Sequence, residues 1–282
     1  MLTSELSKFW ADHNCRFAGF DFVYPVISRR ASGLSIGINC MTNGACSFDC
    51  IYCQSRGGVE AKKAPLPTVN EIFSELKQLL SIYHKTKLAD HFPNIEEKNR
   101  LLKDIALSGD GEPTLYPHFE ELCMELANFQ KENDIPKLVL ITNAVKLANG
   151  FEHLCKNSGE IWGKLDAGTD EWLNFINRPL KKTSVAAIED NLKSIVSKFP
   201  LRIQTMLCEA QGKIPSEAEI ESYSQVVQRI HKENSGNLLS VQLYSPVRKT
   251  ADNSVKPLPR EFLDGVKNIL QNKISRLSVE VF

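Results

Sequence analysis

Three cysteines within a short segment constrain this chain more than any other feature of its sequence. Cys46, Cys50 and Cys53 follow one another with the spacing C-x3-C-x2-C. Because thiolates this close repel one another, the spacing predicts a metal centre that neutralises them. A disulfide between any two would close a small, strained loop and leave one thiol over. A structural zinc ion normally takes four protein ligands, usually as two separated pairs. Three thiolates fit a cuboidal iron-sulfur cluster better, with one of its irons left open.

The cysteine spacing, together with the aromatic Tyr52 just before the third cysteine, resembles the cluster loop of the radical S-adenosylmethionine (SAM) superfamily. The resemblance implies that Cys46, Cys50 and Cys53 hold a 4Fe-4S cluster whose open iron binds SAM. It further implies that the cluster cleaves SAM reductively to a 5′-deoxyadenosyl radical, which abstracts hydrogen from a substrate. An electron donor such as flavodoxin or ferredoxin is implied as well.

The resemblance extends to segments spread over most of the chain. They are residues 25–30, 33–38, 46–54, 108–115, 164–168, 177–179 and 242–246. Together these segments look like the stand-alone radical SAM iron-sulfur oxidoreductases related to the tRNA wybutosine-synthesising enzymes. Membership of this group implies an enzyme with an unidentified substrate, either a small molecule or tRNA.

The composition is that of an ordinary soluble globular chain. Of 282 residues, 42% are hydrophobic and 24% are charged, and the formal net charge is zero. No global field therefore draws the chain to nucleic acid or to anionic lipid. No stretch approaches the roughly 20 apolar residues of a membrane span, and the first residues do not read as a signal peptide. We expect a cytoplasmic protein with no membrane association, in which Cys15, Cys123, Cys155 and Cys208 are buried thiols rather than disulfide partners.

Apolar runs alternate with amphipathic stretches along the chain. The runs predict strands at residues 34–39, 104–107, 138–141, 161–166, 201–207 and 239–244, with a further short strand at 279–282. Six strand-helix units in series require parallel strands joined by right-handed crossovers, in an open sheet or a barrel. The family resemblance implies an α/β fold with an open (β/α)6 partial TIM barrel. We expect one domain, with residues 1–33 as an N-terminal extension covering the barrel and residues 34–282 as the radical SAM core.

Polar residues follow the predicted strands, and in parallel α/β folds the loops after the strands form the active face. Residues 109–113 resemble the Gly-Gly-Glu motif that holds the SAM amino group, so Gly111 and Glu112 are predicted cofactor contacts. A glycine turn with a capping carboxylate is the alternative. Thr142 and Asn143 resemble a Thr-Asn-Gly strand end near SAM, or they are helix caps.

Two further strands carry polar side chains that we expect inside the barrel. Alternation places Lys164 and Asp166 on one face of their strand, where they contact SAM or pair with each other. Gln204 needs polar partners if it faces the barrel interior, and SAM or the substrate can supply them. With Tyr52, these residues complete the predicted cofactor site. No catalytic residue is predicted.

Several alternatives remain at this stage. Cys40 is either a buried thiol or a fourth cluster ligand, and the latter would make the chain an electron carrier rather than an enzyme. Arg29 and Arg30 either bind an anionic substrate or form a surface pair. A tRNA-modifying enzyme would use Arg178, Lys181, Lys182, Arg248 and Lys249 as a basic rim for phosphates.

Overall fold

A curved sheet of eight strands forms the centre of the molecule, in a computed structural model that describes residues 17, 19–54, 64–250 and 252–282. The order across the sheet is β1-β2-β3-β4-β5-β6-β8-β10. The strands are β1 (Val23–Ser28), β2 (Gly33–Ile38), β3 (Leu102–Leu107), β4 (Leu138–Thr142), β5 (Glu160–Lys164), β6 (Leu201–Met206), β8 (Leu238–Tyr244) and β10 (Val279–Val281). The six strands from β2 to β8 in this order are parallel, as predicted.

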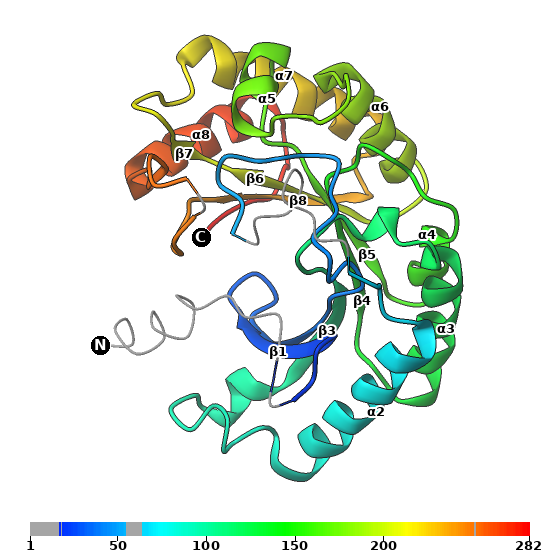
Figure 1. Cartoon of the computed structure of the whole chain (residues 1–282). Helices are drawn as coiled ribbons and strands as arrows, with labels where there is room; N and C mark the ends of the chain where they lie inside the picture. Colours follow the sequence, from blue (N-terminus) through cyan, green and yellow to red (C-terminus); the bar gives the residue numbers. More distant parts are fainter. Residues whose placement is uncertain (1–16, 18, 55–63, 251) are drawn as a thin grey trace.

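Helices cover the convex side of this sheet, while its two edges leave one side of the barrel open (Figure 1). The helices are α2 (Val69–Thr86), α3 (Phe119–Glu132), α4 (Phe151–Leu154), α5 (Asp170–Ile176), α6 (Val185–Val196), α7 (Glu217–Glu233) and α8 (Arg260–Lys273), with short 3-10 turns at Glu97–Arg100 and Pro113–Leu115. The strands β7 (Cys208–Glu209) and β9 (Lys256–Pro257) form a separate small ribbon. The expected open partial barrel is confirmed.

Part of the expected N-terminal extension forms one edge of the sheet. Residues 23–28 form β1, which pairs antiparallel with β2 in the same sheet, Tyr24 lying opposite Gly37. A β-carbon on Gly37 would lie 2.2 Å from the Tyr24 ring, so only glycine lets this ring cross the strand. The hairpin turn carries Arg29 and Arg30. Residues 1–16, and Cys15 with them, lie outside the described residues.

Local sequence signals account for the helix boundaries. Helix α2 begins with a capping box, in which the Thr68 side chain accepts from the Glu71 amide and the Glu71 side chain accepts from the Thr68 amide. Its apolar residues recur at helical spacing and are buried against the sheet: Val69, Ile72, Leu76, Leu79, Leu80 and Tyr83. Helix α4 is a single turn, and its N-cap residue Gly150 adopts a left-handed conformation.

Among the described residues, a large apolar core lies between the sheet and the outer helices, and two smaller buried clusters accompany it. Cys123 and Cys208 are buried and Cys155 is half-buried, and none of them forms a disulfide. Within the described ranges, no helix has both the length and the apolar character needed to cross a lipid bilayer.

Candidate functional site

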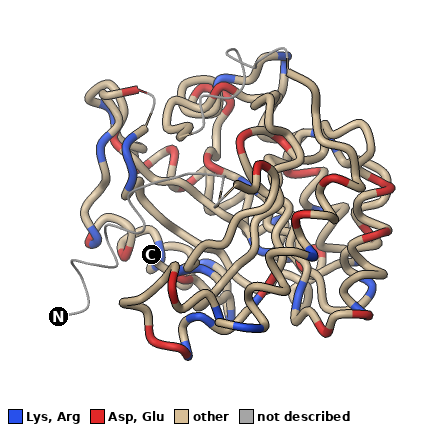
Figure 2. The backbone as a smooth tube through the Cα atoms, turned by 60° about the horizontal axis from the view of Figure 1, so that its bottom comes forward, with Lys and Arg blue, Asp and Glu red and all other residues tan. Residues whose placement is uncertain are grey.

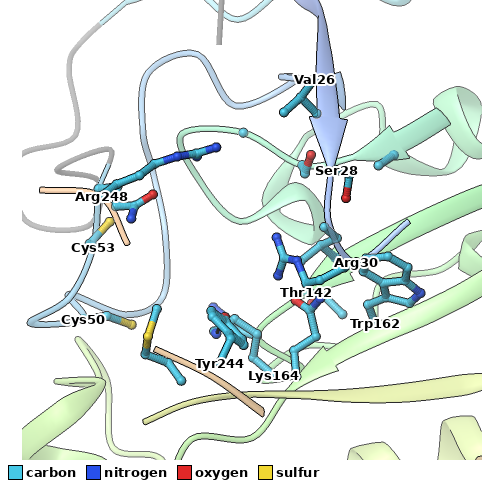
Figure 3. A pocket seen from close by; sticks show the side chains of 18 of the residues that line it. Val26, Ser28, Arg30, Cys50, Cys53, Thr142, Trp162, Lys164, Tyr244 and Arg248 are labelled. Carbon is cyan, nitrogen blue, oxygen red and sulfur yellow. Dashed lines mark hydrogen bonds between the residues drawn. The ribbon is translucent and has the colours of Figure 1, made fainter. Parts of the chain in front are cut away.

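A cavity of about 370 Å³ occupies the inside of the partial barrel (Figure 3). It receives side chains from the cysteine loop, from the loops after β3 and β4, and from β5, β6 and β8. Cys46, Cys50 and Cys53 all line it, and each is half-buried. Of the predicted cofactor contacts, Tyr52, Gly111, Glu112, Thr142, Asn143, Lys164 and Gln204 line the cavity too.

Backbone hydrogen bonds hold the cysteine loop in place from two sides. On one side, the Ile51 amide donates to the Ile176 carbonyl at 2.9 Å. On the other, the Glu112 amide donates to the Ala45 carbonyl at 2.9 Å. A β-carbon on Gly111 would lie 2.3 Å from that carbonyl oxygen. Only glycine therefore lets the loop after β3 pack this closely against the cysteine loop.

Two asparagine side chains direct amide donors at the cysteine sulfurs. Asn143 Nδ2 lies 3.6 Å from Cys46 Sγ, and Asn177 Nδ2 lies 3.4 Å from Cys50 Sγ. Burial raises the pKa of Cys46 to about 11 and that of Cys50 to about 12. These thiols therefore stay protonated at neutral pH unless a metal displaces the proton.

The three thiols do not converge as ligands of one ion. Among the described residues, no three His, Cys, Asp or Glu side chains are grouped so that they could hold a single metal ion. In a cuboidal cluster each thiolate binds a different iron, so the sulfurs surround a volume instead of meeting at a point. Three thiols line this cavity, two of them beside amide donors, which is one fewer than the four protein ligands of a structural zinc site.

Cys40 belongs to the apolar core and is not among the residues that line the cavity. It is 1% exposed, and burial raises its pKa to about 12. The side chain is therefore a buried thiol in this structure.

The carboxylate of Glu112 connects the loops that follow β3 and β4. It accepts hydrogen bonds from Thr142 Oγ1 at 2.6 Å, from the Asn143 amide at 2.8 Å and from Thr114 Oγ1 at 2.8 Å. Burial raises its pKa, although these hydrogen bonds oppose the shift. Most of the acceptor capacity of Glu112 is thus used within the protein.

Lys164 and Asp166 pair with each other, one of the two arrangements that their spacing predicted. Lys164 Nζ lies 3.3 Å from Asp166 Oδ1 and donates to Tyr244 Oη at 2.7 Å. Desolvation lowers the pKa of Lys164, but Asp166 and Tyr244 outweigh it, so the pKa is raised and the side chain is charged. Asp166 also accepts from Tyr52 Oη and from Asn177 Nδ2. Asp166 supports the cavity wall from behind and is not one of the residues lining it.

Gln204 faces the cavity as expected and finds a protein partner. Its Nε2 donates to Gln242 Oε1 at 3.0 Å, and Gln242 in turn donates to Glu280 at 3.1 Å. The side chain is 1% exposed. A neighbouring strand therefore supplies the polar partner that Gln204 needs.

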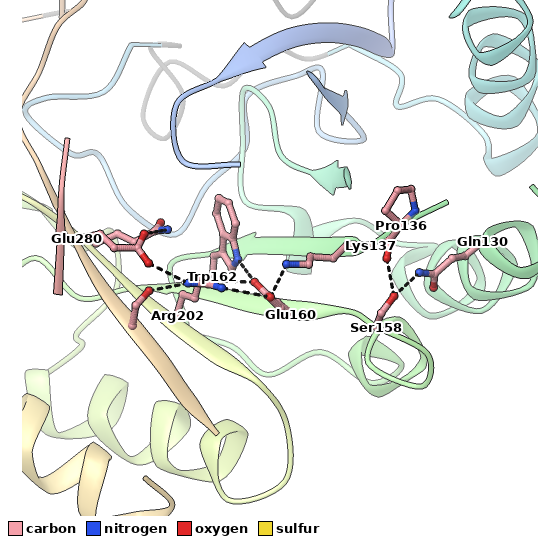
Figure 4. Close-up of polar contacts among 10 residues, drawn as sticks. Gln130, Pro136, Lys137, Ser158, Glu160, Trp162, Arg202 and Glu280 are labelled. Carbon is pink, nitrogen blue, oxygen red and sulfur yellow. Dashed lines mark hydrogen bonds and ion pairs between the residues drawn. The ribbon is translucent and has the colours of Figure 1, made fainter. Parts of the chain in front are cut away.

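A network of charged side chains that was not predicted from the sequence crosses the sheet (Figure 4). Glu160 accepts from Lys137, Arg202 and Trp162. Burial alone would raise the pKa of Glu160, but these three donors lower it to about 2. Nearby on β3, Asp104 accepts from Ser35 and lines the cavity. Alternation along the strands was the available signal, since Glu160, Trp162 and Lys164 share one face.

Charged residues of both signs are interspersed along the described backbone (Figure 2). Of the basic residues proposed as a phosphate-binding rim, Arg178 forms an ion pair with Asp252 at 3.7 Å. This view shows no broad face of one sign, in agreement with the zero net charge.

Comparison with protein families gives one match that spans most of the barrel. The family model of the Radical SAM superfamily matches residues 41–208. The chain is 24% identical over 253 residues to a GTPase Obg of Brachyspira hyodysenteriae, a match that covers 89% of this chain and 33% of that protein. It is 23% identical over 265 residues to a UPF0026 protein of Methanocaldococcus jannaschii, covering 91% of this chain and 73% of that protein. The chain thus spans about a third of the first relative and most of the second.

Two solved structures illustrate the likeness in fold. A radical SAM methyltransferase from Sphaerobacter thermophilus has a TM-score of 0.65 at 15% identity, covering 92% of this chain and 68% of that one. TYW1 with a lysine-pyruvate adduct bound has a TM-score of 0.59 at 18% identity, covering 87% of this chain and 74% of that one. These likenesses show a shared fold.

Proposed function

The chain belongs to the radical SAM superfamily, and on this premise we propose that it is an enzyme that holds a 4Fe-4S cluster through Cys46, Cys50 and Cys53. The observation that carries the proposal is that these three thiols line one cavity while Cys40 lies in the apolar core. When bound, the cluster supplies one electron to SAM, whose cleavage yields methionine and a 5′-deoxyadenosyl radical that removes hydrogen from the substrate.

The chain's own side chains have separate tasks in this proposal. Asn143 and Asn177 donate toward the sulfurs of Cys46 and Cys50, which stabilises them as thiolates once they bind metal. Glu112 holds the loops after β3 and β4 against the cysteine loop. Lys164 and Gln204 present polar atoms to the cavity, where SAM or substrate can bind.

Anaerobic turnover tests this function. Reconstituted protein is incubated with SAM and a strong reductant, and 5′-deoxyadenosine is measured by liquid chromatography. We expect 5′-deoxyadenosine from the unmodified chain and none from Cys50→Ala. If the unmodified chain binds a cluster but forms no 5′-deoxyadenosine, the proposal is wrong.

A second candidate is tRNA base modification in the manner of the wybutosine-synthesising enzymes. The fold likeness to TYW1 favours it, and that structure carries a lysine-pyruvate adduct. A lysine must be neutral to form such an adduct. Lys164 lines this cavity but is held charged by Asp166 and Tyr244. We therefore rank this candidate second. If mass spectrometry finds a borohydride-trapped pyruvate adduct on Lys164, tRNA base modification becomes the favoured candidate.

The third candidate is an electron carrier with Cys40 as the fourth ligand. The burial of Cys40 in the apolar core argues against it. Retention of the cluster in Cys40→Ala is the expected result, and its loss would favour the carrier.

A further inference from the structure

Charged side chains of both signs line the cavity, and most of them interact with other groups of the chain. Those that have such partners are Arg29, Asp110, Glu112, Lys164 and Arg248. The other lining charges are Asp104 and Arg30, which have opposite signs. These two are therefore the charges most available to a ligand.

Asp104 has one carboxylate oxygen that reaches the cavity. The side chain lies on β3 beside Ser35 of β2, whose hydroxyl donates to Oδ1. Among the described residues, none donates a hydrogen bond to the other oxygen, Oδ2. Oδ2 is nevertheless not one of the fully enclosed polar atoms that lack a partner. Although the residue is only 3% exposed, this oxygen is thus accessible from the cavity that Asp104 lines.

The protein compensates the charge of Asp104 only in part. Burial raises the pKa of Asp104 to about 6, and the hydrogen bond from Ser35 opposes this shift. The charges of Lys137 and Arg30 oppose it too. Lys137, however, is paired with Glu160, whose own charge raises the pKa of Asp104. At neutral pH the carboxylate is thus ionised in surroundings where a cationic partner would stabilise it.

Arg30 carries the opposite charge nearby. It lies in the turn after β1, and its guanidinium lies over the Tyr244 ring, 5.2 Å from the centroid (Figure 3). Among the described carboxylates, none forms an ion pair with Arg30. An aromatic face therefore stabilises this cation while its fork of donors stays available. Asp104 and Arg30 are near enough for their charges to interact, yet they do not pair with each other.

This pair of charges favours a ligand that carries both signs. Arg30 would repel a simple cation at Asp104, and Asp104 would repel a simple anion at Arg30. An amino-carboxylate offers an ammonium group to Asp104 and a carboxylate to Arg30, and a guanidinium binds a carboxylate through two parallel hydrogen bonds.

The position of Asp104 separates this site from the loops that are predicted to contact SAM. Asp104 lies in the first half of β3, roughly 10 Å from the end of the strand, after which Gly111 and Glu112 follow. The cysteine loop packs against that same strand end. A ligand at Asp104 therefore lies deeper in the barrel than the predicted SAM contacts after β3.

We propose that the substrate is an amino-carboxylate, such as a free amino acid, whose ammonium group binds Asp104 and whose carboxylate binds Arg30. Bound in this way, it occupies the inner part of the cavity, below the cysteine loop. That this ligand is the substrate rests on the proposed function, whereas its binding does not.

Saturation-transfer nuclear magnetic resonance on the purified full chain tests the site without SAM and without turnover. The probes are a mixture of the standard L-amino acids, their decarboxylated amines and their deaminated acids. We expect at least one amino acid to bind, and its matched amine and acid to bind about tenfold more weakly or worse. Asp104→Asn and Arg30→Gln should each weaken the amino acid by about tenfold or more.

Asp190→Asn, exposed on the outer helix α6, is the matched control and should stay within about twofold. Circular dichroism checks that the variants fold, and Arg30, in a turn, provides a variant that should keep the fold. The site is overturned if no amino acid binds, or if an amine or acid binds as well as its amino acid. It is also overturned if SAM displaces the amino acid, because the site would then belong to SAM.

A second measurement tests the link to the substrate. Protein is incubated with SAM, reductant and deuterated cell extract, and deuterium transfer to 5′-deoxyadenosine identifies the hydrogen donor. We expect a donor that a cation exchanger retains in acid, below the carboxyl pKa, and an anion exchanger retains in alkali, above the ammonium pKa. A donor that only one exchanger retains would contradict the inference. Absence of 5′-deoxyadenosine would contradict the proposed function instead, and the binding measurement would still decide the site.

Discussion

Thr142 Oγ1 donates a 2.6 Å hydrogen bond to Glu112 Oε1, and this contact joins the loops that follow two neighbouring strands. Glu112 also receives the Asn143 amide, and Asn143 reaches Cys46. The geometry of the cysteine loop therefore depends on a buried carboxylate that belongs to a different strand end.

Replacing this carboxylate should damage both stability and cluster binding. Glu112→Ala leaves the hydroxyl and amide donors of Thr142, Asn143 and Thr114 without their buried acceptor, which we expect to cost about 3 kcal/mol of unfolding free energy. Urea unfolding of the metal-free chain measures the cost, and iron content after reconstitution should fall. Glu121→Ala, exposed on helix α3, is the matched control and should change stability by less than about 0.5 kcal/mol. Equal unfolding midpoints for the two variants would contradict this role.

The antiparallel pairing of β1 with β2 depends on the absence of a side chain at Gly37. Gly37→Ala would place a β-carbon 2.2 Å from the Tyr24 ring, and we expect a loss of about 1–3 kcal/mol from overpacking. Gly265→Ala, within helix α8, meets no atom within 4 Å and should raise stability by about 0.5–1 kcal/mol. Thermal unfolding of the two variants should therefore shift in opposite directions, and a shift in the same direction would show that β1 packs differently.

Asp104 should make stability fall as pH rises. Burial raises its pKa to about 6 from an ordinary value of 3.8. The folded chain therefore holds this proton more tightly than the unfolded chain does. The resulting stabilisation is complete below the unfolded pKa and is lost as pH rises through the folded pKa. It amounts to at most about 3 kcal/mol.

The measurement compares the unmodified chain with Asp104→Asn, which cannot titrate. Between pH 4 and pH 7, the unfolding free energy of the unmodified chain should decrease relative to that of the variant. A difference that stays constant over this window would mean that Asp104 has an ordinary pKa in the folded chain.

The charge network around Glu160 should matter far more than an exposed ion pair. Glu160→Ala leaves Arg202 and Lys137 without their shared buried partner, at an expected cost of about 3 kcal/mol or more. Asp264→Ala removes an exposed partner of Arg260 and should cost less than about 1 kcal/mol. Chemical unfolding at pH 7 compares the two, and similar costs would show that the network is solvated.

The parallel core of the fold was predictable because each strand carries its own signal. Short apolar runs separated by amphipathic helices led to six parallel strands, and all six are present. The antiparallel pairing of β1 was missed because it depends on a contact between Tyr24 and Gly37 that no local period reveals. The expected division into an extension and a core stays a prediction.

The candidate site was predictable only in part, for the same reason. Motif resemblance and strand-end positions located the cysteines, Glu112 and Asn143 near one another. The side chains that contact the site residues come from distant parts of the sequence. Asn177 reaches both Cys50 and Asp166, and Arg30 reaches Tyr244 across the open side of the barrel. Such contacts follow from the curvature of the sheet and have no periodic signature in the chain.

In the proposed function, three thiols leave one iron of the cluster open to SAM. Electron paramagnetic resonance of the reduced, reconstituted chain tests it directly, in the unmodified protein and in Cys40→Ala. We predict a cluster signal in both proteins that changes when SAM is added. A signal that SAM leaves unchanged, or one that disappears when Cys40 is replaced, would contradict the proposed function.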